Sequence, residues 1–125
     1  MKKLLIAILL FCAFFSINSC KKNQLGGKAR LKGQVKHHEA IIPNAYIYIK
    51  YNATEFPGDD YTAYDTYTQA DASGNYSISF YKGSYYLYAV GEDKNIPAPQ
   101  TVKGGLSISI RNKELLTKDI AVTED

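Results

Sequence analysis

Cysteine is nearly absent from this sequence of 125 residues, and both copies, Cys12 and Cys20, lie within its first twenty positions. The rest of the chain therefore has no thiol for a disulfide, a metal ligand or a nucleophile, so its stability must come from packing. The sequence also has no Gly-x-Ser-x-Gly turn, and no serine that it places near a histidine and an acid. We therefore expect no enzyme activity, and we expect no cofactor.

A large excess of positive charge is missing as well. The 15 basic residues include Lys2 and Lys3, and without these two the remaining 13 are balanced by 12 acidic residues. Nucleic-acid binding depends on basic side chains that neutralise phosphates. The near-neutral balance therefore predicts no nucleic-acid partner.

The N-terminal segment has the order of a secretory signal. Lys2 and Lys3 precede an apolar run over residues 4–15, and small or polar residues follow at 16–19. The apolar run is shorter than the roughly 20 residues that a helix needs to cross a membrane. The pattern predicts that residues 1–19 are a cleaved signal peptide.

The residues Ile17-Asn18-Ser19-Cys20 resemble the lipobox of bacterial lipoproteins, in which an apolar branched residue and a small residue precede the lipidated cysteine. Asn18 departs from the residue usual at its position. The resemblance implies lipid attachment at Cys20, and each buried acyl methylene would contribute about 0.8 kcal/mol of membrane affinity. Because Lys21 and not Asp follows the cysteine, it also implies a location in the bacterial cell envelope, on the outer membrane.

Residues 20–27 are polar and end in two glycines, as in a flexible tether, and residues 28–125 fit one domain. In that domain apolar and polar residues alternate with a period of two, which is typical of half-buried strands. The sequence predicts an all-β, seven-stranded antiparallel β-sandwich. The expected strands are 31–35, 45–49, 61–69, 76–80, 85–89, 106–110 and 116–122.

Four motifs over residues 28–91 resemble the carboxypeptidase regulatory-like domain. They are Leu31-x-Gly33-x-Val35, Pro43-Asn44-Ala45-x-Ile47-x-Ile49, Thr68-x-x-Asp71-x-x-Gly74-x-Tyr76-x-Ile78 and Gly83-x-Tyr85-x-Leu87-x-Ala89. The resemblance implies a prealbumin-like (transthyretin-type) sandwich. Domains of this family are mostly non-catalytic accessories, so it also implies a binding or scaffolding role.

Tyrosine is abundant, with eleven copies, and tryptophan is absent. If the apolar residues of 45–49 and 85–89 face the core, then Tyr46, Tyr48, Tyr86 and Tyr88 face outward. These four rings would form an exposed patch for a protein or a sugar if the two strands are neighbours. The alternative is that tyrosine serves here as a strand-forming residue. Phe56 lies in the long polar loop 52–60, and the favoured interpretation is a plug over one end of the core, with a functional role of the loop as the alternative.

Polar residues gather on the connections at one end of the predicted sandwich. His37 and His38 are adjacent and on a strand would point to opposite faces, so other metal ligands would have to come from distant loops. If the strands alternate in direction, one end of the sandwich collects His37, His38, Glu39, Asp71, Glu92, Asp93, Glu124 and Asp125. This tip would hold a divalent cation, meet a basic partner or be a solvated loop cluster. For Asp71 the favoured interpretation is a turn cap, with ion ligation as the alternative.

The sequence thus predicts a non-enzymatic, lipid-anchored envelope module that binds a protein partner or ligand. One alternative is an accessory lipoprotein that recognises glycan for an uptake or degradation system. Another is a structural spacer.

The anchor generates a first prediction. Cys20→Ala should leave the chain unprocessed or soluble, because no other residue is placed to receive the lipid. Detergent-phase partitioning of the full-length protein measures this. If the substituted protein still enters the detergent phase, Cys20 is not the anchor.

Overall fold

The structure, a computed structural model, describes residues 21–124. The predicted signal peptide, the predicted lipid-bearing Cys20 and the acidic Asp125 lie outside the described residues. Apart from one short 3-10 helix, the regular structure of residues 21–124 is all β. Among these residues no helix has the length and apolar character to cross a membrane.

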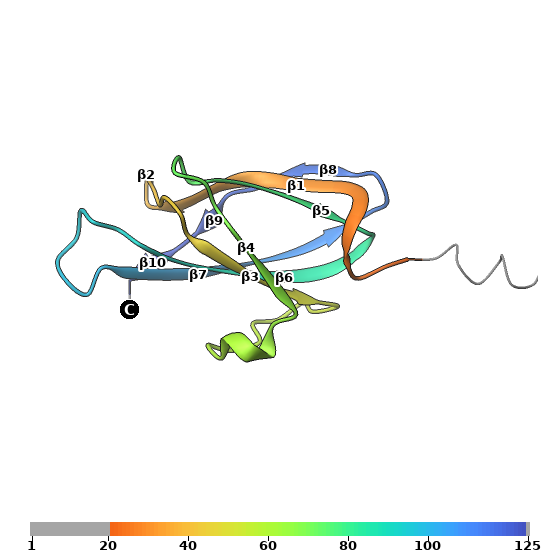
Figure 1. Ribbon diagram of the computed structural model, residues 1–125, viewed down its shortest axis with the longest axis horizontal. Coiled ribbons are helices and arrows are strands. Elements are labelled where there is room, and N and C mark those ends of the chain that lie inside the picture. The colour runs from red at the N-terminus through yellow and green to blue at the C-terminus, as the bar shows by residue number, and fades with distance from the viewer. Residues whose placement is uncertain (1–20, 125) are drawn as a thin grey trace, which may run out of the picture.

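Two sheets pack face to face as a sandwich, which confirms the all-β, two-layer prediction (Figure 1). One sheet is built around β1, which pairs with β2, β5, β8 and β9, and the other has the order β10-β7-β6-β3-β4. The elements are β1 (Leu25–His37), β2 (Ala40–Ile41), β3 (Tyr46–Tyr51), η1 (Tyr61–Ala63), β4 (Thr66–Gln69), β5 (Asn75–Phe80), β6 (Gly83–Glu92), β7 (Thr101–Ile110), β8 (Leu115–Thr117), β9 (Ile120–Ala121) and β10 (Thr123–Glu124).

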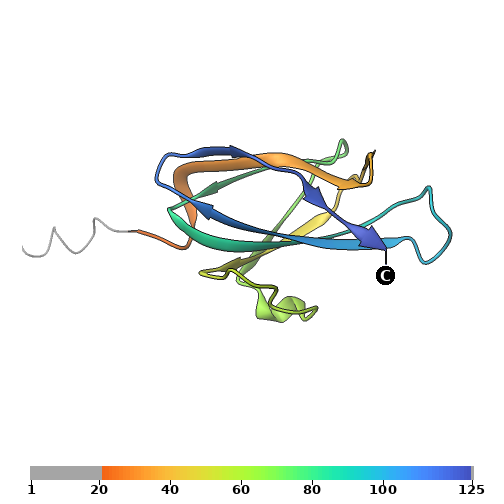
Figure 2. The same ribbon diagram turned by 180° about the vertical axis from the view of Figure 1, so that it is seen from behind.

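The prediction that all strands pair antiparallel is wrong for the C-terminal segment. β8 and β9 pair with β1 in parallel, whereas β10 pairs antiparallel with β7. The chain turns back after β7 and then runs in the same direction as β1, so a pairing with β1 has to be parallel. Figure 2 shows this return, in blue, on the side of the sandwich that faces the viewer, and the C-terminal end lies opposite the first described residues.

The prediction of a strand over 61–69 is wrong in its first half. β4 begins only at Thr66, and residues 61–63 form the 3-10 helix η1. Asp60 explains the difference, because its carboxylate accepts hydrogen bonds from the backbone N–H of Thr62 at 3.0 Å and from its hydroxyl at 2.6 Å. Such a local cap stabilises a helical turn over an extended strand.

The expected flexible tether also needs correction, because β1 begins at Leu25 and the residues before it contact the sandwich. The N–H of Asn23 donates to the carbonyl of Lys82 at 2.9 Å, and the carbonyl of Gln24 accepts from the N–H of Tyr81 at 2.8 Å. A Cβ on Gly27 would lie 2.2 Å from the carbonyl oxygen of Phe80, so only glycine allows this close approach.

The core follows the predicted alternation. Leu31 and Val35 of β1 are fully buried against the inward-facing residues of the opposite sheet. Gly33 lies between them, and a Cβ there would meet the backbone oxygen of Lys118 at 1.8 Å, so only glycine fits. The other predicted inward residues that are buried are Ala45, Ile47, Ile49, Tyr76, Ile78, Phe80, Tyr85, Leu87, Ala89, Ile108, Ile110, Ile120 and Val122.

Tyr85 is the largest fully buried side chain. Its ring centroid lies 4.3 Å from that of Phe80, and its hydroxyl donates toward the carbonyl oxygens of Tyr81 at 2.7 Å and of Gln24 at 3.0 Å. The ring therefore packs against apolar neighbours in the core, and the buried hydroxyl has hydrogen-bond partners.

Truncation of this ring gives the second prediction. Tyr85→Ala should lower the free energy of unfolding by about 3–5 kcal/mol, because it leaves a large cavity. Tyr67→Ala removes the same atoms from a ring that is 62% exposed and should cost under about 1 kcal/mol. Urea titration of both variants measures the difference, and equal losses would contradict the described register.

Candidate functional site

The outer face of the second sheet carries a cluster of aromatic rings, here called the aromatic face. β3 and β6 are neighbours, with Tyr48 directly opposite Tyr88, and Tyr67 of β4 is opposite Tyr48 on its other side. This confirms that the four predicted tyrosines share one face. The aromatic face comprises Tyr46, Tyr48, Phe56, Tyr61, Tyr64, Tyr67, Tyr86 and Tyr88.

The prediction that Tyr88 is exposed is wrong, because the segment 52–65 folds over it. The ring of Tyr88 stacks with that of Tyr64 and lies 5.0 Å from that of Phe56, and its hydroxyl donates to Asp59 Oδ1 at 2.6 Å. Only 5% of Tyr88 remains exposed. Phe56 is likewise not a plug over one end of the core, since it lies on the outer face against Tyr86 and Tyr88.

The exposed part of the aromatic face was only partly predicted. Tyr46, Phe56, Tyr61 and Tyr67 are four of the six large hydrophobic side chains that are exposed in residues 21–124. Tyr48 contacts two of them, because its ring stacks on that of Tyr61 at 4.4 Å and lies 6.0 Å from that of Tyr67. Tyr67 could have been found from its alternation with Thr66 and Thr68, whereas Tyr61 reaches this face only because η1 turns the chain.

The segment 52–65 gives the aromatic face an acidic rim. It contains Glu55, Asp59, Asp60 and Asp65, all exposed, and no lysine or arginine. One of these charges is paired, because Asp65 lies 3.7 Å from the ammonium of Lys50. The rim therefore carries a net negative charge beside exposed apolar rings.

The tip of the sandwich brings three of the predicted polar residues together. His37 Nδ1 lies 2.7 Å from Asp93 Oδ2, and its Nε2 lies 3.8 Å from Glu124 Oε1. Both His37 and Asp93 are buried, and the hydrogen bond from His37 holds the pKa of the Asp93 carboxyl below its usual value. This confirms that the strands predicted over 31–35 and 85–89 and the C-terminal strand, which are β1, β6 and β10 in the structure, end at the same end of the molecule.

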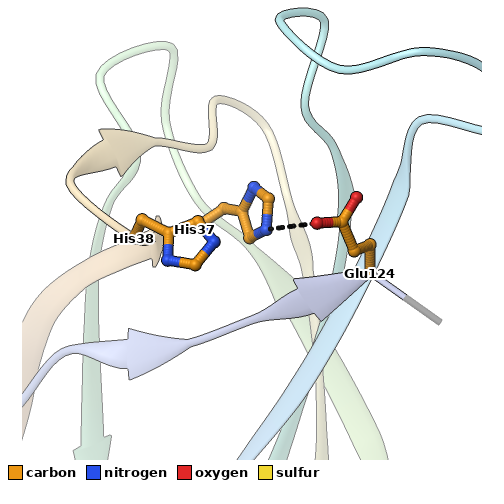
Figure 3. A group of neighbouring side chains, drawn as sticks. All are labelled: His37, His38 and Glu124. Atoms are coloured by element: carbon orange, nitrogen blue, oxygen red, sulfur yellow. Dashed lines mark ion pairs between the residues drawn. The ribbon is translucent and has the colours of Figure 1, made fainter.

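The position of the His38 ring contradicts the expectation that the two histidines point to opposite faces of the strand. β1 ends at His37, and His38 has a left-handed backbone with φ of 56°. Its ring therefore returns to the side of His37, with the ring centroids 4.5 Å apart. His37, His38 and Glu124 each offer a ligand atom within 4.8 Å of the others (Figure 3).

The remaining tip residues do not join this group among the described residues. Asp71 accepts hydrogen bonds from the N–H groups of Ser73 at 2.8 Å and Asn75 at 2.9 Å, which confirms its interpretation as a turn cap. Gly74 completes that turn at φ of 73°. Glu39 and Glu92 are exposed and lie outside the three-residue group.

Comparison with models of protein families finds no match, and comparison with curated proteins finds none either.

Burial of the covered tyrosines generates the third prediction. Desolvation raises the pKa of Tyr64 from 10.0 to about 12. Between these values the folded protein keeps a proton that the unfolded chain loses, so the free energy of unfolding should fall as pH rises through this window. Urea titrations at about pH 9 and about pH 11 should show the loss, and Tyr64→Phe should make it smaller. An identical loss in the variant would contradict a buried Tyr64 hydroxyl.

Proposed function

We propose that this chain is a non-enzymatic, lipid-anchored module of the bacterial cell envelope that binds a basic protein partner through its aromatic face. In this proposal Cys20 carries the lipid, the outer membrane is the location, and the sandwich is of the prealbumin-like type. The resemblance of the motifs around Gly33 and Asp71 to carboxypeptidase regulatory-like domains supports an accessory binding role.

The observation that carries the proposal is the concentration of exposed aromatic side chains on one face. Four of the six large exposed hydrophobic side chains among residues 21–124 are gathered there. Exposed apolar patches of this kind mark interaction sites, and tyrosine is enriched in protein interfaces because it offers both apolar area and a hydroxyl.

The charge of the rim supports a basic partner. Glu55 and Asp60 are the chain neighbours of the exposed Phe56 and Tyr61, and Asp59 accepts a hydrogen bond from Tyr88. The segment 52–65 offers no positive charge of its own. A partner with lysine or arginine around an apolar centre would complement this surface, and opposite charges would speed its approach.

The arrangement of the rings favours a protein over a sugar. A sugar stacks on an open ring face, but Tyr48 and Tyr61 stack on each other with planes only 8° apart. Tyr46 and Tyr67 meet edge to face, with planes at 60°. The surface is therefore uneven, as protein interfaces are, and glycan recognition remains the alternative that the experiment separates.

The segment after the proposed anchor bears on how the domain is presented. Asn23 and Gln24 hydrogen-bond to the turn between β5 and β6, and the ammonium of Lys21 lies 5.7 Å from the ring centroid of Tyr81. An anchor at Cys20 would thus hold this end of the sandwich close to the membrane. The tip with His37 and Glu124 would then point away from it.

Site-specific crosslinking in the producing bacterium tests the interface and is the fourth prediction. A photoreactive phenylalanine analogue replaces Tyr67 in the full-length lipoprotein, and in a control it replaces Ser77, which is exposed on the outer face of the other sheet. We expect one discrete protein adduct from position 67 and none from position 77. Tyr46→Ser with Tyr61→Ser should abolish it, and Glu55→Gln with Asp60→Asn should weaken it, as should high salt in isolated membranes.

Three outcomes would contradict the proposal. Equal adducts from positions 67 and 77 would mean that the aromatic face is not the interface. Saturable binding of the detergent-solubilised protein to a glycan array, lost in Tyr67→Ala, would favour the accessory glycan-binding lipoprotein. No adduct and no glycan binding would leave the structural spacer.

A further inference from the structure

We propose that His37, His38 and Glu124 form a zinc site at the tip of the sandwich, with Asp93 as the residue that orients His37. The site is separate from the aromatic face and does not depend on the proposed protein partner. Its ligand atoms lie within 4.8 Å of one another and come from the end of β1 and from β10 (Figure 3).

Asp93 prepares His37 to act as a ligand. Its carboxylate lies 2.7 Å from Nδ1, and the two side chains are only 3% and 6% exposed, so the ring is held in one orientation. With its proton on Nδ1, the neutral ring donates to Asp93 and leaves a lone pair on Nε2, which lies toward Glu124. A carboxylate that holds the distal nitrogen of a histidine is the usual support of a zinc-ligating imidazole.

The backbone places His38 where a second ligand is needed. A histidine that continued β1 would point to the opposite face of the sheet from His37. The left-handed φ of 56° at His38 instead brings its ring beside that of His37. Such a conformation is uncommon for a residue with a side chain, and it is frequently found at functional sites.

Glu124 completes the set from the C-terminal strand. β10 pairs with β7, and this pairing carries Glu124 to within 3.8 Å of His37 Nε2. Zinc bonds of about 2.0–2.1 Å would place tetrahedral ligand atoms roughly 3.3–3.5 Å apart. His38 and Glu124 are both exposed, and their side chains can rotate to close the remaining distance.

The donor set selects the metal. Two imidazole nitrogens and one carboxylate oxygen, with a fourth position for water, suit zinc, whereas calcium and magnesium prefer sites made wholly of oxygen. The carboxylates of Glu124 and Asp93 also balance the two charges of the ion. Cysteine is not required for such a site.

Zinc binding to the full-length lipoprotein in detergent tests the proposal and is the fifth prediction. Isothermal titration with Zn²⁺ should show one site per chain, and His38→Gln and Glu124→Gln should each weaken binding by roughly tenfold or more. Glu39→Gln is the matched control, because Glu39 is an exposed acidic neighbour outside the group, and it should change nothing. The wild type loaded with Co²⁺ should show the visible absorption of a tetrahedral site.

Asp93→Asn tests the role of the orienting carboxylate. It should weaken zinc binding while leaving one site per chain, because the three ligands remain. The thermal unfolding midpoint without metal identifies any variant that has simply lost its fold. Substoichiometric binding by the wild type, an equal loss in Glu39→Gln, or equal affinity for Ca²⁺ would each overturn the zinc site.

Discussion

The antiparallel pairing of β3 with β6 fixes both the core side and the aromatic outer side of the second sheet. Because side chains alternate across a strand, the register that points Ile47 and Leu87 inward must point Tyr48 and Tyr88 outward. A shift of one residue would bury hydroxyls and expose the aliphatic core. The aromatic face is thus a consequence of the same pairing that stabilises the sandwich.

The segment 52–65 converts that face from a flat row of tyrosines into a layered surface. It places Tyr64 over Tyr88, and the hydroxyl of Tyr88 in β6 donates to Asp59 of the segment at 2.6 Å. Within the segment, the hydroxyl of Tyr64 donates to the carbonyl of Gly58 at 3.0 Å. The same segment supplies the acidic rim. The segment that covers Tyr88 therefore adds two exposed rings of its own, Phe56 and Tyr61, and these lie in the same acidic segment.

The C-terminal return decides what gathers at the tip. β8 and β9 extend the first sheet beside β1, and β10 then joins the second sheet beside β7. This crossing closes one side of the sandwich, and it ends with Glu124 next to His37. A structural requirement, the closing of an open sheet edge, thus also assembles the proposed zinc ligands.

By itself the sequence determined the all-β class, the two-layer core and the outward side of β3 and β6, because a period of two depends only on neighbouring residues. It also placed His37, Asp93 and Glu124 at one end of the sandwich. Because successive strands run in opposite directions, the number of preceding strands tells at which end each strand finishes. It did not determine the parallel pairing of β8 with β1, the covering of Tyr88, or the position of the His38 ring. The parallel pairing depends on which strands become neighbours in the fold. The other two depend on local backbone conformations, the cap at Asp60 and the left-handed turn at His38, which an alternation of apolar and polar residues does not reveal.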